Sequence, residues 1–173
     1  ASTQADALVS PNGNNIMNLT SHPRLLFTAA QYDRLKVSPQ TPLLQEAARQ
    51  VSQLANQFLQ DSTIEVDETG HNWHLIRARR MQTRVFTLLV EWKRTGDTRY
   101  RNAALADVKR IREWEYWSWI AWRKKDPAPD AIYDLSYGEN STTLALAFDA
   151  MFDSLSKDGI TLFAETASHR ALM

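Results

Sequence analysis

The segment from residue 72 to Gly96 constrains the fold most, because its apolar residues demand burial on several sides of one long helix. Its first half carries four arginines, whereas the part from Val85 to Trp92 is apolar nearly all round, as in a helix that enters a core. Gly96 suits the left-handed conformation that ends many helices. Asp97 or Thr98 can then cap the next helix, so the sequence predicts an antiparallel helical hairpin.

Capping residues predict two helices before this hairpin. Thr28 and Gln31 occupy the two positions of a capping box, which predicts a short helix to about Val37. Thr41 followed by Pro42 predicts a second helix to about residue 60, since proline is favoured at the first helical position. Apolar residues recur along this second helix at spacings of three and four, which is typical of an amphipathic helix.

Two more helices are predicted near the C-terminal end. Asn140 or Ser141 is the expected N-cap of the first and Ser156 of the second, which is still running at Met173. No strand pattern of convincing length is present, so the predicted fold class is all-α. Antiparallel helical hairpins, joined by short turns on one side and long loops on the other, fit part of an (α/α) toroid.

Composition limits the domain organisation and the classes of partner. The length of 173 residues suits one domain, with 1–21 expected as a flexible N-terminal arm and 22–173 as a partial toroid truncated at the C-terminus. The 20 basic and 20 acidic side chains balance, which argues against nucleic acid as a partner. The chain has no cysteine and no apolar run long enough for a membrane span. Because it begins with Ala1, we expect a processed product whose export signal has been removed.

A cluster of tryptophans separates the two halves of the chain. Four of the six tryptophans lie within the nine residues 114–122, which fit neither a helical nor an extended period and predict a helix end followed by an ordered loop. Arg123 and two lysines follow directly. Aromatic rings beside cations favour an anionic, ring-shaped ligand such as an acidic sugar, although the same rings also suit an interhelical core with a solvated basic edge.

Several of these segments resemble the heparinase II/III-like polysaccharide lyases, a group that includes alginate and oligoalginate lyases. The similar motifs are HPRLLFT at 22–28, WHLIRARRMQ at 73–82, TGDTRY at 95–100, DLSYGE at 134–139 and AFDAMFD at 147–153. The resemblance implies an N-terminal (α/α) toroid followed, in longer members, by a β-sandwich. It also implies β-elimination on uronate-containing polysaccharides, and a periplasmic or secreted location.

The same resemblance assigns catalysis to residues outside the matching segments. In the family an Asn or His neutralises the uronate carboxylate, and a Tyr and a His act as base and acid. No position in this chain matches those motifs, so its catalytic residues are unknown. We expect the chain to contribute one wall of an acidic-polysaccharide cleft, with the remaining toroid and β-sandwich of a longer chain as its partners.

Three groups of residues are candidates for substrate contact. The first lies before a predicted helix N-terminus, where free N–H groups and the helix dipole favour anions. The second combines stacking rings with a cation, and the third places two arginines one turn apart as an anion clamp. In order, the groups are Tyr137, Glu139 and Asn140; Trp119, Trp122 and Arg123; and Arg80 with Arg84. The alternatives are a cap, a first-turn acid and a packing ring for the first group, core packing for the second, and ion pairs for the third.

Metal and cofactor sites receive little support from the sequence. Glu68, His71 and His74 are close in sequence, but three ligands in a polar loop are weak evidence, and neither a metal nor another cofactor is expected. A partial toroid exposes an apolar edge, so self-association is also expected.

Two rival functions use the same fold. The first is a non-catalytic helical module that binds glycans or another protein through the aromatic loop. The second is a toroid glycoside hydrolase or epimerase, for which Glu139 with Asp130 or Asp134 would be the carboxylate pair.

Overall fold

The computed structural model describes residues 21–126 and 134–171, and within these ranges every regular element is helical. The all-α class is therefore confirmed, whereas the predicted arm lies outside the described residues except for Ser21. In chain order the elements are α1 (Ala29–Arg34), α2 (Pro42–Gln60), α3 (Trp73–Thr95), α4 (Thr98–Glu113), α5 (Trp119–Lys124), α6 (Leu135–Met151), the 3-10 turn η1 (Phe152–Ser154), α7 (Lys157–Thr166) and the π-helical turn η2 (Ala167–Ala171).

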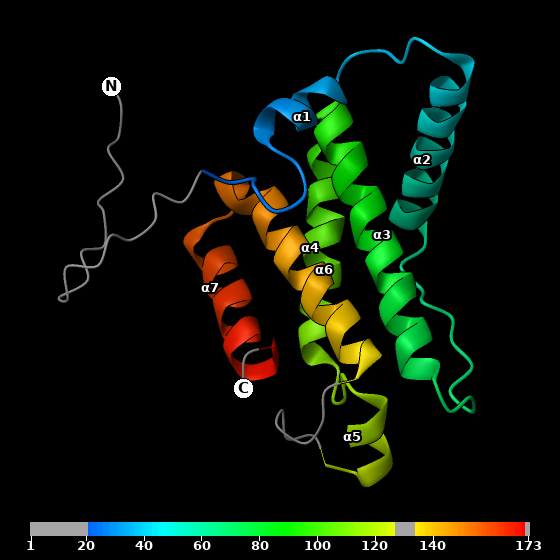
Figure 1. Ribbon diagram of the computed structural model, residues 1–173, viewed down its shortest axis with the longest axis vertical. Coiled ribbons are helices and arrows are strands. Elements are labelled where there is room, and N and C mark those ends of the chain that lie inside the picture. Colours follow the sequence, from blue (N-terminus) through cyan, green and yellow to red (C-terminus); the bar gives the residue numbers. More distant parts are fainter. Residues whose placement is uncertain (1–20, 127–133, 172–173) are drawn as a thin grey trace, which may run out of the picture.

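Helix α3 lies at the centre of the bundle and packs against α2, α4 and α6. Figure 1 shows α2 on one flank of the bundle and α7 on the other. The chain direction alternates between α2, α3 and α4, so these helices are antiparallel to their sequence neighbours. As a result, the start of α3, the end of α4 and the start of α6 meet at one end of the bundle, beside the short helix α5 (Figure 1).

The predicted hairpin and most predicted caps are confirmed. Gly96 ends α3 in the left-handed conformation with φ 75°, and the Asp97 side chain caps α4 by accepting from the Arg99 N–H. Thr28 forms its capping box with Gln31. The hydroxyls of Thr41 and Ser156 cap α2 and α7 as expected, each accepting a backbone N–H of the first turn.

The core lies where α3, α4 and α6 face one another. It explains why the second half of α3 is apolar nearly all round, because neighbouring helices cover several of its sides. The largest fully buried apolar side chains are those of Met81, Val85, Leu88, Val108, Ile111 and Met151. Each contributes roughly 1.5–3 kcal/mol through burial of its apolar surface.

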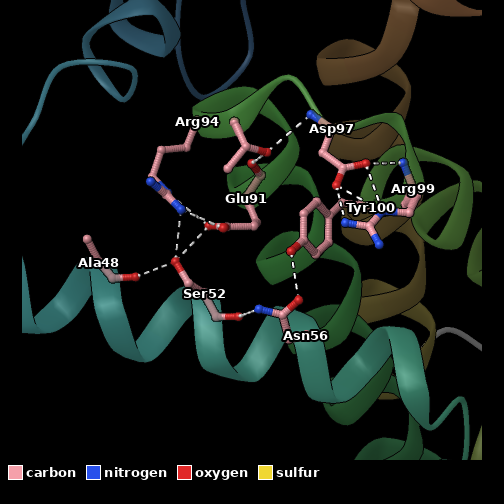
Figure 2. Close-up of polar contacts among 9 residues, drawn as sticks. Ala48, Ser52, Asn56, Glu91, Arg94, Asp97, Arg99 and Tyr100 are labelled. Atoms are coloured by element: carbon pink, nitrogen blue, oxygen red, sulfur yellow. Dashed lines mark hydrogen bonds and ion pairs between the residues drawn. The ribbon is translucent and has the colours of Figure 1, made fainter.

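A polar network fastens α2 to the hairpin (Figure 2). The buried Glu91 carboxylate pairs with Arg94 at 2.6 Å and accepts a hydrogen bond from the Ser52 hydroxyl at 3.2 Å. One turn further along α2, Asn56 Oδ1 accepts from the Tyr100 hydroxyl at 2.9 Å. These contacts satisfy polar groups that would be costly to bury alone.

The segment before α1 is anchored to α6 by a single carboxylate. Asp149, which is buried, accepts from the backbone N–H groups of Arg24 and Leu25, each at 2.8 Å. The same carboxylate lies 2.5 Å from His22 Nδ1, and the His22 ring packs 4.2 Å from the Phe152 ring. This anchor holds residues 22–25 on the bundle.

The predicted start of α6 is wrong. Neither Asn140 nor Ser141 caps it, because the helix begins at Leu135 and Asp134 is its N-cap. Asp134 Oδ1 accepts from the N–H groups of Ser136 and Tyr137 at 2.7 and 3.2 Å. This cap satisfies donors in the first turn and outweighs the low helix propensity of the residues that follow.

Helix α5 was not predicted as a separate element. The predicted helix end is confirmed at Glu113, but the predicted loop is wrong from Trp119 onward, where the chain turns helical again. Ser118 caps the new helix by accepting from the N–H groups of Ile120 and Ala121, each at 3.1 Å.

Candidate functional site

A pocket opens at the end of the bundle where α3 begins. Its volume of about 420 Å³ lies in the range of small-ligand sites. Aromatic rings and charged groups of both signs line it. The lining residues are Glu68, Trp73, His74, Arg77, Glu115, Tyr116, Trp122 and Lys125.

Arg77 is the organising cation of this pocket. Its guanidinium carbon lies 3.9 Å from the Trp114 ring centroid and 4.7 Å from that of Trp73, so two indole rings hold it. One guanidinium nitrogen, Nη2, donates to the Tyr116 carbonyl at 2.8 Å. Its Nε is buried and has no hydrogen-bond partner among the described residues.

Among residues 21–126 and 134–171, Arg77 forms no ion pair with a carboxylate. Every ion pair within these residues has a different side chain as its basic partner. Desolvation lowers the pKa of Arg77 to about 10, with the Glu68 charge opposing this shift. The side chain therefore stays charged at neutral pH. A partly buried cation without a counter-ion is unfavourable, and a bound anion would relieve it.

His74 supplies a neutral polar group at the same site. It is 2% exposed, its ring centroid lies 3.7 Å from that of Trp73, and its Nδ1 has no partner in the described part of the chain. Desolvation and the nearby Arg77 charge lower the pKa of His74 to about 4, against the opposing charge of Asp134. At neutral pH the imidazole is uncharged and can exchange hydrogen bonds with an uncharged ligand group.

Helix α5 forms the remaining wall. The Trp122 ring centroid lies 6.0 Å from Trp73 and 5.3 Å from His74, and the Lys125 ammonium sits 4.9 Å from the Trp122 ring. The hydroxyl of Ser118, which caps α5, also donates to the Asp134 carboxylate at 2.6 Å. Asp134 thus links the first turns of α5 and α6 and holds Trp122 over the start of α3.

The second predicted group lies on this wall. Trp122 lines the pocket, whereas Trp119 and Arg123 sit on the same short helix outside the lining. The Arg123 guanidinium lies 5.0 Å from the Trp119 ring, so ring and cation are adjacent as expected. Contact of these three residues with a sugar stays a prediction.

The first predicted group occupies a different setting from the one expected. Tyr137, Glu139 and Asn140 lie inside α6 rather than ahead of it, so they do not present a helix N-terminus to an anion. Tyr137 and Asn140 are buried, and the Tyr137 ring packs 5.9 Å from Trp117. Glu139 pairs with Arg79 at 2.9 Å.

The predicted arginine clamp does not form. Arg84 is buried and pairs with Asp107 at 2.6 Å, while its other nitrogens donate to the carbonyls of Asp61 and Phe58 at 2.7 and 2.5 Å. Its donors serve the fold, as in the ion-pair alternative. Arg80 is exposed and donates to the Glu65 carbonyl on the loop before α3.

The residues that the sequence analysis missed are Arg77, His74 and Trp114 as parts of one site. A signal for them was present, since an antiparallel hairpin places the start of α3 beside the end of α4. Trp73 and Arg77 are also four residues apart, on one side of α3.

Other kinds of site find no support in the described ranges. Residues 21–126 and 134–171 contain no grouping of three or more His, Cys, Asp or Glu side chains that could hold a metal ion. Over the same residues, no helix has the length and apolarity needed to cross a membrane. No family model matches the sequence, and no curated protein gives a significant match. A functional assignment therefore depends on the chemistry of the pocket and on the motifs themselves.

Proposed function

We propose that this chain is the N-terminal helical part of a polysaccharide lyase that cleaves uronate-containing polysaccharide by β-elimination. The observation that carries the proposal is Arg77, a charged group in contact with two indole rings in a pocket without a close counter-ion. The reaction class comes from the motifs at 22–28, 73–100 and 134–153, which resemble heparinase II/III-like lyases. In this proposal the hairpins are the opening part of an (α/α) toroid, and the enzyme is periplasmic or secreted.

The pocket suits the first requirement of β-elimination. Removal of the proton next to a uronate carboxylate develops negative charge, which a fixed cation stabilises. Arg77 provides that charge, with Lys125 as a second cation, and the half-buried Trp122 offers a ring against which a sugar can stack. The base and the acid of the reaction are assigned to the remaining toroid and sandwich of a longer chain.

A lyase assay combined with a binding assay tests this proposal. The chain is incubated with alginate, heparin, heparan sulfate, hyaluronan or ulvan, and the ultraviolet absorbance of unsaturated uronate ends is followed. Quenching of tryptophan fluorescence by the same polymers reports binding. We expect quenching by at least one uronate polymer without product formation. Failure of every polymer to bind would refute the proposal, and product formation would place the catalytic groups within this chain.

A non-catalytic glycan-binding module is the second candidate. It is favoured by the lack, in this sequence, of any position that matches the catalytic motifs of the lyases. A natural stop codon after Met173 would favour this module, whereas a reading frame that continues for several hundred residues would favour the lyase.

The hydrolase or epimerase alternative receives less support. Glu139 is paired with Arg79, and Asp134 is occupied as the cap of α6. Asp130 lies outside the described residues.

A further inference from the structure

We propose that residues 16–19 dock onto an apolar groove between α6 and α7 of the same chain, with Met17 and Leu19 as the inserted side chains. The groove shares no lining residue with the pocket at the start of α3, so this docking is independent of sugar binding. Three features support it: the apolar groove, the anchor beside one end of the groove, and the spacing of the apolar residues before that anchor.

The groove has a volume of about 420 Å³ and an almost wholly apolar lining. It lies between α6 and α7, which are neighbours in the bundle (Figure 1). An apolar surface of this kind is unfavourable in water unless another apolar group covers it. Its apolar lining residues are Leu144, Ala145, Phe148, Phe163, Ala164 and Ala167.

The anchor at Asp149 brings the N-terminal part of the chain to this groove. The Asp149 carboxylate holds the backbone of residues 24–25, and the His22 ring lies 5.7 Å from the Phe148 ring. Phe148 lines the groove and packs 5.3 Å from Phe163 on the opposite wall. Residues 1–20, which lie outside the described residues, therefore join the bundle beside the groove.

The spacing of the apolar residues before the anchor fits the groove. Met17 and Leu19 are two positions apart, so in an extended segment they share one face and are separated by about 6.5 Å. Leu144 and Phe148 are four positions apart on α6, which corresponds to about 6 Å along the helix. If Leu19 packs on Phe148, the next inward side chain, Met17, therefore reaches the level of Leu144.

A buried polar atom in the groove also needs a partner. Ser141 lines the groove, and its Oγ is buried without a hydrogen-bond partner among the described residues. Ser141 precedes Phe148 by about two helical turns, or about 10 Å. Residues 16–20 span about 16 Å when extended, so their backbone reaches Ser141 and can supply the hydrogen bond that buried polar groups usually make.

The short connection favours residues 16–19 over a second copy of the chain as the occupant. Two residues join Leu19 to the anchored His22, and so short a tether gives an effective concentration on the order of 1 mM. A second copy competes on equal terms only when the protein itself is that concentrated. Self-association through the groove therefore requires displacement of residues 16–19.

Disulfide cross-linking tests the position of residue 17, because the chain has no cysteine of its own. Met17→Cys is combined with Ala145→Cys in the groove or, as a control, with Asp153→Cys. Both partner residues are exposed, and Asp153 follows Phe152, whose ring lies 4.2 Å from that of His22, so the tether can reach either. We expect the groove pair to form an intrachain disulfide at least about tenfold faster, after correction for the reactivity of each thiol.

Serine substitutions provide a second measurement on chains without cysteine. Met17→Ser with Leu19→Ser removes the proposed inward face, whereas Ile16→Ser with Asn18→Ser alters the opposite face and is the matched control. We expect the first pair to raise several-fold the fluorescence of Nile red, a neutral dye that binds exposed apolar surface, and the control pair to leave it unchanged. Circular dichroism checks that each variant is folded.

Each result either supports or overturns the docking. Equal cross-linking rates in the two cysteine pairs would overturn it. A groove-pair disulfide that joins two chains would overturn it in favour of a second copy as the occupant. If the cysteine variants do not fold, unchanged Nile red fluorescence in Met17→Ser with Leu19→Ser, or an equal rise in the control pair, would overturn it instead.

Discussion

Acidification from about pH 7 to about pH 5 is expected to destabilise this protein through His74. The structure buries the neutral imidazole beside Arg77, and the pKa of His74 falls from its ordinary value of 6.5 to about 4. Below pH 6.5 the imidazole of His74 becomes protonated in the unfolded chain, whereas in the folded chain it stays neutral down to about pH 4. Stability is therefore fully present above about pH 6.5 and is lost as the pH falls toward about 4.

The size of this effect follows from the two pKa values. A difference of one pKa unit corresponds to about 1.4 kcal/mol. The pKa difference at His74 therefore lowers the unfolding free energy by roughly 3 kcal/mol once the pH is below the folded pKa. Between about pH 7 and about pH 5 the expected loss is about 2 kcal/mol of unfolding free energy. That loss is large beside the roughly 5–15 kcal/mol of a typical domain.

Urea unfolding, followed by circular dichroism across this pH range, measures the loss. His74→Gln keeps a neutral polar side chain but cannot titrate, and the other histidines and carboxylates are common to both proteins. We expect the stability of the wild type to fall about 2 kcal/mol further than that of the variant between about pH 7 and about pH 5. Parallel pH dependences in the two proteins would refute the argument that His74 is held neutral by its surroundings.

Three further predictions concern the fold and its exposed edge. Asp107→Asn should lower the unfolding free energy by about 3–5 kcal/mol, because it leaves Arg84 buried without its partner. Replacement of both residues with apolar ones should restore most of this loss, as measured by urea unfolding. Gly96→Ala should lower the unfolding free energy by about 1 kcal/mol, because the position has φ 75°. Gly138→Ala lies inside α6 with open space around it and should raise the unfolding free energy by about 0.5–1 kcal/mol. Lower unfolding free energies in both variants would contradict the conformational argument. The apolar groove of about 420 Å³ between α6 and α7 should promote self-association. Sedimentation should therefore show a concentration-dependent dimer, and Ala145→Glu should dissociate it. A wild-type monomer at high concentration would count against self-association through this groove.

The parts of the fold that local chemistry determines were predictable from the sequence. Gly96, Asp97 and the capping residues Thr28 and Thr41 act as their residue types indicate, because caps depend on a few neighbouring atoms. The start of α6 was missed because the residues after Asp134 have weak helix propensity. The cap at Asp134 stabilises that first turn despite them, and it is tied in turn to Ser118 of α5.

The candidate site was harder to predict because it depends on contacts between elements. Trp122 was selected for its residue type, and it does line the pocket. Arg77 is one of four arginines in the first half of the same helix, and its setting differs from that of Arg84 through the partners that the folded chain brings to each. Arg84 meets a carboxylate, whereas Arg77 meets two indole rings. Local sequence does not specify which of these partners an arginine will find.

The most direct test of the central claim is to titrate the isotope-labelled protein with an acidic oligosaccharide and record the indole N–H signals of its tryptophans by nuclear magnetic resonance. The Trp73 indole N–H is unpartnered within the described residues, and Trp122 lines the same pocket, whereas Trp92 lies at the far end of α3. We expect saturable shifts for Trp73 and Trp122 and none for Trp92. Saturable shifts confined to other tryptophans, or no shifts at all, would contradict a sugar site at the start of α3.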